Sequence, residues 1–341
     1  MNLDGIININ KPQNMTSHDV VRRLRRLFGM KKIGHTGTLD PMATGVLPVC
    51  LGSATRITEY LDLDFKTYRC TMMLGMNTDT QDVWGEKTGE FDTSRVTEEA
   101  VRDAFRPFHG EILQTPPMYS AVRVDGRRLY EYARAGETVD VKSRKIFIRA
   151  LTVDAVDLRA MTVTFTVECS KGTYIRTICQ DVGTALGTGA VMTSLVRLAS
   201  GRFRIEDAVT LEELEKGKKT ACQGIENEEA SESWPGNILL PPDYPLIHFG
   251  RAVLDPAMSR KFTDGWHIPM KDCRIEAEPE FAHREPEQTI RDEYRRAWCL
   301  YREAENGEES PQFLGVAFYD LQYKKLVADK VFFRGDWNEN I

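Results

Sequence analysis

The stretch from Met161 to Leu186 constrains the fold most, because its hydrophobic period changes within a few residues. Up to Cys169, apolar side chains alternate with threonines and a glutamate, which is the period of a half-buried strand. The change of period predicts a strand that leads into a helix, and it indicates a mixed α/β protein. The polar sequence SKGTYIRT lies at this junction, where mixed α/β proteins usually place a functional site. The residues that repeat at helical spacing are Ile175, Ile178, Val182 and Leu186.

The sequence IGHTGTLDPMATGVLPVCLG, from Ile33 to Gly52, holds one carboxylate, Asp40, in a loop rich in glycine and threonine. Glycine permits positive φ and a close approach of a ligand to the backbone. Pro41 biases Asp40 away from helical geometry. The apolar run that follows predicts a buried strand, so a stiff loop would hold a single acid against it. Most Asp-Pro pairs only stabilise a turn, and local composition alone favours that role.

The composition is that of a soluble globular protein large enough for two domains. Of the 341 residues, 41% are apolar and 28% are charged. No apolar run approaches the length that spans a bilayer, and the first residues lack the pattern of a signal peptide. The seven cysteines include no Cys-x-x-Cys pair, which argues against a zinc site and a disulfide framework. We therefore expect a cytoplasmic protein without a metal and without membrane contact.

The net charge of −6 is unevenly distributed along the chain. Residues 1–35 carry seven basic against two acidic side chains, and residues 120–204 carry fourteen against eight. Acidic side chains predominate in residues 206–232, nine against three, and in residues 276–309, eleven against five. A basic front and an acidic back fit a protein that binds a polyanion on one side. An ordinary solvated surface accounts for the charges equally well.

Local patterns predict further elements along the chain. Thr16 and Asp19 have the spacing of a helix cap, and Asp125-Gly126 is typical of a hairpin turn. The sequence TDTQD, residues 78–82, lacks the glycine and the distal glutamate of a calcium loop. The expected strands cover residues 5–10, 66–74, 313–319 and 325–333, and the expected helices lie near 20–28, 54–61, 94–108, 127–135 and 211–215.

Several motifs resemble those of one family. GHTGTLDPMATG resembles the signature of the TruB family of tRNA pseudouridine synthases. Further motifs similar to that family's follow its order within residues 5–205: KPQNMTS, then KTY, TDTQD, PPMYSA, SKGTYIRT and SLVRLASGRF. Asn14 stands where the family usually has glycine, and asparagine tolerates left-handed geometry better than most residues. The resemblance implies a mixed α/β fold around a bent, antiparallel-rich sheet.

The resemblance assigns three catalytic residues. It makes Asp40 the nucleophile, places the ring of Tyr68 against the target base, and pairs Arg176 with Asp40. The pairing has a physical reason, because burial raises a carboxyl pKa whereas a contacting arginine lowers it and keeps the acid ionised. Without the resemblance, Tyr68 is more simply a packing residue and Arg176 a surface arginine of a helix.

The resemblance also implies six substrate-binding residues. The ring of Tyr174 lines the pocket, and Leu195 forms its apolar wall. Arg134 belongs to an RNA-contacting insertion at about residues 120–150 and would contact phosphates. The full set is Lys11, His35, Arg134, Tyr174, Leu195 and Arg197.

We expect three regions along the chain. Residues 1–215 form the pseudouridine-synthase catalytic domain, and residues 216–241 form an acidic linker rich in small polar residues. Residues 242–341 form a small, mostly β domain, at the position where family members often carry an RNA-binding PUA-like domain. The acidic linker predicts few contacts between the two domains.

Pseudouridine formation breaks the C1′–N1 bond of a uridine, rotates the base and rejoins it through C5. Because nothing is oxidised or hydrolysed, no cofactor is needed, and the sequence carries no phosphate-loop or dinucleotide fingerprint. The implied substrate is the uridine at position 55, in the T-arm of tRNA, and we expect a monomer. Two alternatives stay open: an RNA-binding or tRNA-folding factor in which catalysis is not essential, and a pseudouridine synthase for another RNA.

Overall fold

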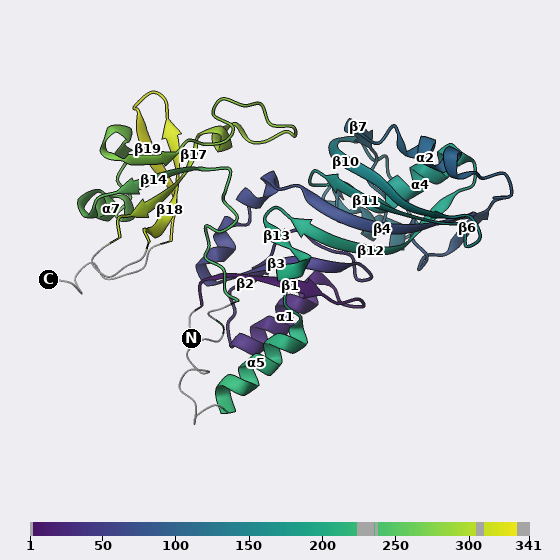
Figure 1. The fold of residues 1–341 in the computed structure, drawn as a ribbon, viewed down its shortest axis with the longest axis horizontal. Helices are drawn as coiled ribbons and strands as arrows, with labels where there is room; N and C mark the ends of the chain where they lie inside the picture. Colours follow the sequence, from purple (N-terminus) through teal and green to yellow (C-terminus); the bar gives the residue numbers. More distant parts are fainter. Residues whose placement is uncertain (1–2, 224–234, 236–237, 305–309, 333–341) are drawn as a thin grey trace.

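The computed structural model describes residues 3–223, 235, 238–304 and 310–332. Two β-sheets dominate the molecule, a large one built from residues 5–204 and a smaller one built from residues 250–331 (Figure 1). Helices pack against both sheets, so the expected mixed α/β fold is confirmed. None of the helices in the described residues combines the length and the hydropathy needed to cross a membrane.

The large sheet contains nine strands. They are β1 (Gly5–Lys11), β2 (Ile33–His35), β3 (Thr44–Leu51), β4 (Lys66–Leu74), β7 (Gly110–Gln114), β10 (Arg144–Asp157), β11 (Thr162–Cys169), β12 (Ala190–Ser200) and β13 (Phe203–Arg204). Their order is β1-β3-β12-β4-β11-β10-β7, with β2 on β3 and β13 on β12. Neighbours pair antiparallel except β3 and β12, which join in parallel at Thr44–Val196 and Gly45–Arg197. The expected antiparallel-rich sheet is therefore confirmed.

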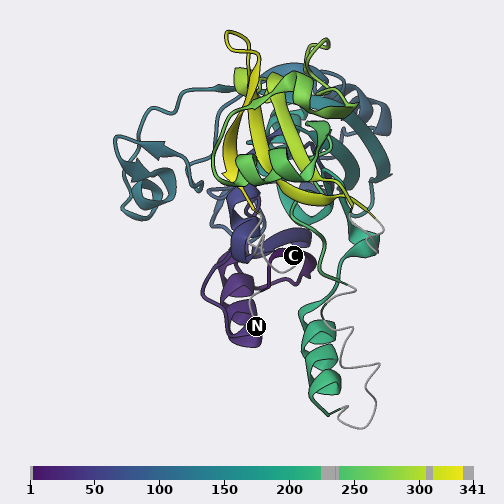
Figure 2. The ribbon, with the colours of Figure 1, turned by 90° about the vertical axis from the view of Figure 1, so that its left-hand side faces the viewer.

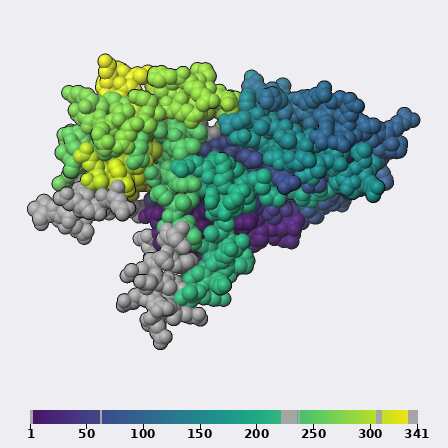
Figure 3. Space-filling view, in the orientation of Figure 1, coloured from purple at the N-terminus to yellow at the C-terminus, as the bar shows by residue number. Residues whose placement is uncertain are grey.

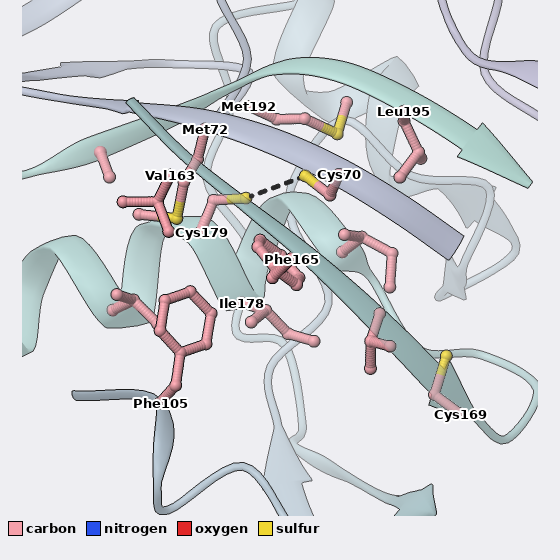
Figure 4. Close-up of a cluster of buried hydrophobic side chains, with 14 of the residues drawn as sticks. Cys70, Met72, Phe105, Val163, Phe165, Cys169, Ile178, Cys179, Met192 and Leu195 are labelled. Atoms are coloured by element: carbon pink, nitrogen blue, oxygen red, sulfur yellow. Dashed lines mark hydrogen bonds between the residues drawn. The ribbon is translucent and has the colours of Figure 1, made fainter. Parts of the chain in front are cut away.

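Helices cover the large sheet in two places (Figure 1). Two of them, α1 (Ser17–Phe28) and α5 (Leu211–Gln223), pack against β1 and β3 over a core that includes Val20, Leu47 and Leu211. The other two, α2 (Glu98–Phe105) and α4 (Ile175–Leu186), cover the far half of the sheet. Figure 4 shows the core of that half, where the sulfur atoms of Cys70 and Cys179 lie 3.6 Å apart.

Two local predictions are confirmed in detail. The Thr16 hydroxyl accepts a hydrogen bond from the Asp19 N–H at 3.0 Å, and the Asp19 carboxylate accepts one in return from the Thr16 N–H, as a capping box requires. The alternating face of β11 is buried, and Phe165 packs against Phe105 of α2 with ring centroids 5.0 Å apart. The expected helix at residues 54–61 is instead two 3₁₀ turns, Gly52–Ile57 and Tyr60–Leu63.

Two hairpins extend from the large sheet. One pairs β5 (Met76–Thr78) with β6 (Lys87–Glu90). The other pairs β8 (Arg123–Val124) with β9 (Arg127–Arg128) and continues into α3 (Leu129–Arg134). Its turn is the expected Asp125-Gly126, both with positive φ. Figure 2 shows the segment around α3 standing out to one side of the body.

The small sheet has the order β15-β19-β18-β17-β14-β16, with β14 (Gly250–Leu254), β15 (Ile268–Pro269), β16 (Arg274–Ala277), β17 (Ala297–Arg302), β18 (Gln312–Asp320) and β19 (Lys325–Val331). One helix, α7 (Pro256–Thr263), packs against it. The expected mostly β character of this part is confirmed. Phe333, the expected end of the last strand, lies outside the described residues.

The two sheets share one hydrophobic core, so the expectation of few contacts between them is wrong. Tyr60, next to the large sheet, packs edge-on against Phe249 at 5.2 Å and against Tyr294 at 5.9 Å, both from the C-terminal part. Figure 3 shows the C-terminal atoms, in yellow and light green, directly against the blue and teal atoms of the large part. Local composition did not reveal this contact, because it depends on faces that meet only in three dimensions.

The region expected to be an acidic linker is partly ordered structure. Helix α5 continues through Gln223, past the expected end of the first domain at residue 215. Leu240 pairs with Ile6 of β1 through two backbone hydrogen bonds of 2.8 Å. Residues 224–234, the middle of the expected linker, lie outside the described residues.

Candidate active site

A cavity of about 400 Å³ opens where the Asp40 loop meets β4, β12 and the start of α4. Five of the residues singled out from the sequence line it together: Asp40, Tyr68, Tyr174, Arg176 and Arg197. They come from four separate segments of the chain, because Tyr174 and Arg176 share one, so the fold assembles what the sequence keeps apart.

Asp40 lies in the loop between β2 and β3. Its carboxylate is 47% exposed and lies 3.1 Å from a terminal nitrogen of Arg176, whose side chain is only 7% exposed. The loop is tied to α1 by Ser17, because the Leu39 N–H donates to the Ser17 hydroxyl at 2.9 Å. The acid is therefore reachable from the cavity while its backbone is held in place.

Arg176 lies in the first turn of α4, and its guanidinium is held by several acceptors at once. It donates to the carbonyl oxygen of Thr80 at 2.9 Å and to that of Tyr119 at 3.1 Å. The carboxylate of Asp82 is 3.8 Å away. A planar guanidinium with donors on several sides suits this arrangement, which aims the remaining donors at Asp40.

Arg197 also lines the cavity and is almost completely buried. It donates to the carbonyl oxygens of Val46 at 2.6 Å and Gly37 at 2.9 Å. Gly45, with φ +99, permits this packing, because a Cβ there would come within 2.3 Å of the Arg197 carbonyl oxygen. Arg197 thus fixes both ends of the Asp40 loop.

Two tyrosines supply aromatic surface in the cavity. Tyr68 lies on β4 directly opposite Arg197 of β12, and burial raises the pKa of its hydroxyl, so the phenol is neutral. Tyr174 precedes α4, and its backbone N–H and carbonyl are both held by the amide of Gln114, at 2.8 and 3.1 Å. The backbones that carry the two rings are thereby held by strand pairing or by hydrogen bonds.

Four of the sequence-predicted residues do not line the cavity. Leu195 is 8% exposed and belongs to the core beneath β12, and His35 of β2 is half-buried. Burial, with Arg197 nearby, lowers the pKa of His35. Arg134 of α3 places its guanidinium 5.3 Å from the ring centroid of Tyr130, which does line the cavity. Their substrate-binding roles stay predictions.

Lys11 is the fourth of these residues and is fully buried. Its ammonium donates to the carbonyl oxygens of Pro12 at 2.9 Å, Met15 at 2.6 Å and Pro41 at 3.2 Å. All three donors are taken within the protein, so the geometry favours a role in holding the Asp40 loop over a contact to substrate. Burial lowers the pKa of Lys11 to about 8, although nearby Asp40 acts to raise it.

Several residues that build the cavity were not predicted from the sequence. The lining includes Lys66, Tyr119, Ser120 and Tyr130. Asp82 does not line the cavity, but its carboxylate lies 3.8 Å from the Arg176 guanidinium. Lys66 had a signal, since it is the lysine of the KTY motif. Asp82 had none beyond its motif, because its pairing with Arg176 joins positions far apart in the chain. Among the described residues, no group of three or more His, Cys, Asp or Glu side chains could hold a metal ion.

Two family models match consecutive parts of the chain. Residues 25–175 match the model for "TruB family pseudouridylate synthase (N terminal domain)". Residues 176–246 match the model for "tRNA pseudouridylate synthase B C-terminal domain". Together with the mixed sheet and its cavity, these matches place the protein in the class of pseudouridylate synthases.

Curated relatives agree over most of the chain. The tRNA pseudouridine synthase B of Alkaliphilus oremlandii is 44% identical over 266 residues, which cover 78% of this chain and 83% of the relative. The protein of the same name from Clostridium tetani is 43% identical over 273 residues, 80% of this chain and 88% of the relative. The chain belongs to the TruB family.

Solved structures extend the likeness to the C-terminal part. In the "Crystal Structure of a Cbf5-Nop10-Gar1 Complex", one chain is 25% identical with a TM-score of 0.69, and the match covers 98% of this chain and 86% of that one. The family models end at residue 246, whereas this match also includes the small sheet.

Proposed function

We propose that this protein converts the uridine at position 55, in the T-arm of tRNA, to pseudouridine, with Asp40 as the nucleophile. The observation that carries the proposal is the Asp40–Arg176 pair at 3.1 Å, on the wall of a cavity that also contains Tyr68. The curated relatives are named tRNA pseudouridine synthase B, which supports tRNA as the substrate.

The reaction is an isomerisation, and the cavity residues fit its requirements. The C1′–N1 bond breaks, a C1′–C5 bond forms, the proton on C5 leaves and N1 gains one, so no oxidant, water or cofactor is consumed. Asp40 provides the nucleophilic oxygen, and the Arg176 guanidinium pairs with that carboxylate and keeps it aimed when RNA displaces water from the cavity. A single ionised acid suits this chemistry, whereas glycoside hydrolysis uses two carboxylates.

The target base must leave its stack to reach Asp40. The rings of Tyr68 and Tyr174 line the cavity and offer stacking surface, which contributes about 1–3 kcal/mol per base in single-stranded RNA binding. Arg134 and the other arginines of the β8–β9 hairpin and α3 contact phosphates beside the target. We also assign His35 and Leu195 to the substrate side, as the family motifs imply, and Arg197 to the support of the Asp40 loop.

The proposal extends to the organisation and setting of the protein. The large sheet and its helices, through the end of α5 at Gln223, form the catalytic domain, with the RNA-contacting insertion at about 120–150, and residues 242–341 form a PUA-like domain that adds RNA contacts. The protein acts as a monomer in the cytoplasm on tRNA, without metal or cofactor.

The test is conversion of an unmodified tRNA transcript by the purified protein, with pseudouridine mapped to single-nucleotide resolution. We expect conversion at position 55 and none when that uridine is replaced by cytidine. Conversion at another position would refute the T-arm assignment. Tight binding without conversion by the wild-type protein would instead support a tRNA-folding factor.

A further inference from the structure

Asp64 lies two residues before β4 and is held from the C-terminal part of the chain. Its carboxylate is 4% exposed and packs against Gly201, where a Cβ would come 2.4 Å from the Asp64 Cγ. Nε2 of His248 lies 3.7 Å from Oδ1 of Asp64, and Nδ1 of His248 pairs with the carboxylate of Glu280. His248 therefore lies between one carboxylate from each part of the molecule.

The next residue, Phe65, is also held by a charged side chain that connects to the C-terminal part. The guanidinium of Arg149 lies over the Phe65 ring, 3.6 Å from its centroid. Arg149 in turn forms ion pairs with Glu287 of the C-terminal part at 2.6 Å and with Glu168 of β11 at 2.9 Å. Two consecutive residues are thus held by side chains that connect to residues 248–287.

These two residues lead directly into the cavity. The Lys66 ammonium donates to the Asp64 carbonyl oxygen at 2.8 Å, and Lys66 lines the cavity. Tyr68 is two residues further along β4, so it lies on the same face of the strand. A displacement of Asp64 or Phe65 would be passed to both Lys66 and Tyr68.

We propose that His248 with Glu280, and Arg149 with Glu287, form a brace through which the C-terminal part positions Lys66 and Tyr68 for the reaction. The inference rests on the proposed function and adds positioning residues that lie outside the cavity. It gives the C-terminal part a role in the chemical step in addition to any RNA contact.

The charges around His248 make the brace sensitive to pH. Burial acts to lower the pKa of His248, but hydrogen bonds with Asp64 and Glu280 outweigh it and hold the pKa above its usual value. Glu280 is also paired with Arg284 at 3.2 Å, and the Lys66 ammonium lies on the other side of Asp64. Because the folded-state pKa is raised, the charged bridge is present at low pH and is lost as pH rises through that pKa.

The test compares two variants of the full-length protein, His248→Gln and Lys330→Met. The second is a matched control, because Lys330 pairs with Glu59 and so joins the same two parts away from Lys66. Turnover of a tRNA transcript is measured from about pH 6 to 9, across the range in which histidine titrates. We expect His248→Gln to lower kcat about five- to tenfold with KM changed less than about twofold. In the wild type we expect kcat to decline as His248 loses its proton with rising pH, and His248→Gln should not show this decline. Lys330→Met should change neither kcat nor its pH dependence.

A second measurement reads the brace without catalysis. Lysine side chains are labelled by reductive methylation with ¹³C, and the Lys66 resonance is assigned through a Lys66→Arg variant. We expect this resonance to shift in His248→Gln and to stay in place in Lys330→Met, with both variants folded by thermal denaturation. Equal effects of the two variants on kcat, or an unmoved Lys66 resonance, would overturn the brace. A wild-type protein that modifies no uridine would refute the proposed function, while the resonance would still decide the brace.

Discussion

The two buried arginines of the cavity carry the same charge but have different partners. The Arg176 guanidinium faces the carboxylates of Asp40 at 3.1 Å and Asp82 at 3.8 Å. Arg197 donates to the backbone carbonyls of Val46 and Gly37, and no carboxylate of the described residues lies within ion-pair distance of it. Arg176 therefore contacts the proposed nucleophile, whereas Arg197 fixes the loop that carries the nucleophile.

This difference shows that burial and charge do not by themselves indicate a catalytic role. A buried arginine is tolerated only when its donors are satisfied, and backbone carbonyls can do this as well as carboxylates. The partners decide what the residue contributes. We expect substitutions of Arg176 to lower the turnover rate, and substitutions of Arg197 mainly to lower the free energy of unfolding.

The largest expected effect is that of Asp40→Asn, which keeps the shape of the side chain but removes its charge. Turnover should fall by at least about a thousandfold, more than about 4 kcal/mol of barrier. The tRNA dissociation constant should stay within about tenfold, because we assign Asp40 to the chemical step and not to phosphate binding. Single-turnover rates and filter binding measure the two quantities.

A suitable control for that variant is Asp19→Asn, in the capping box of α1 and outside the cavity. It should turn over tRNA at nearly the wild-type rate. Residual activity of Asp40→Asn at a tenth of wild type would show that another group is the nucleophile.

Arg176→Lys should have the next largest effect. Lysine keeps the charge but loses the planar fork, so it cannot serve the Thr80 and Tyr119 carbonyls and Asp40 together. We expect about a hundredfold loss of kcat, or about 2.7 kcal/mol. Near-normal turnover under saturating tRNA would mean that positive charge alone is sufficient.

Elements set by local pattern were predictable from the sequence. The strand at residues 66–74, the cap at Thr16 and the turn at Asp125 depend on side chains within a few positions of one another. Recognition of family motifs also placed Asp40 beside Arg176, and the structure has that contact. Motifs alone did not separate a residue that lines the cavity from one that supports the Asp40 loop, as Lys11 illustrates.

The contacts between the two sheets were not predictable in this way. Tyr60, His248 and Glu280 have partners that are far away along the chain, and no local motif indicates these pairings. The same holds for Asp82, whose distance from Arg176 depends on how the segment after β5 folds back over α4. Long-range geometry of this kind requires the structure.

The next prediction concerns Arg197. Arg197→Lys should mainly destabilise the protein. The two backbone carbonyls would lose donors in a buried setting, which costs about 1–3 kcal/mol in the free energy of unfolding. Turnover of the folded fraction should fall by less than about tenfold, about 1.4 kcal/mol of barrier. Urea denaturation and single-turnover rates on the same preparation separate the two effects. A loss of turnover equal to that of Arg176→Lys, with unchanged stability, would remove the distinction between the two arginines.

The smallest expected effect concerns Lys11, whose ammonium donates to the Pro41 carbonyl oxygen and so supports the Asp40 loop. Burial lowers the pKa of Lys11 to about 8, so its ammonium becomes a neutral amine as pH rises through that value. A neutral amine has two N–H groups for three carbonyl acceptors, and the weakest of the bonds is the one to Pro41 at 3.2 Å, next to Asp40. We expect kcat to fall about threefold between about pH 7 and 9, which corresponds to the partial loss of one hydrogen bond. Single-turnover rates across this range measure the decline, with Lys32→Arg as an exposed control. Lys11→Arg, which stays charged, should move the decline to higher pH. If kcat of Lys11→Arg falls at the same pH as that of the wild type, another group causes the decline. Lys11 then has only a structural role that does not depend on its charge.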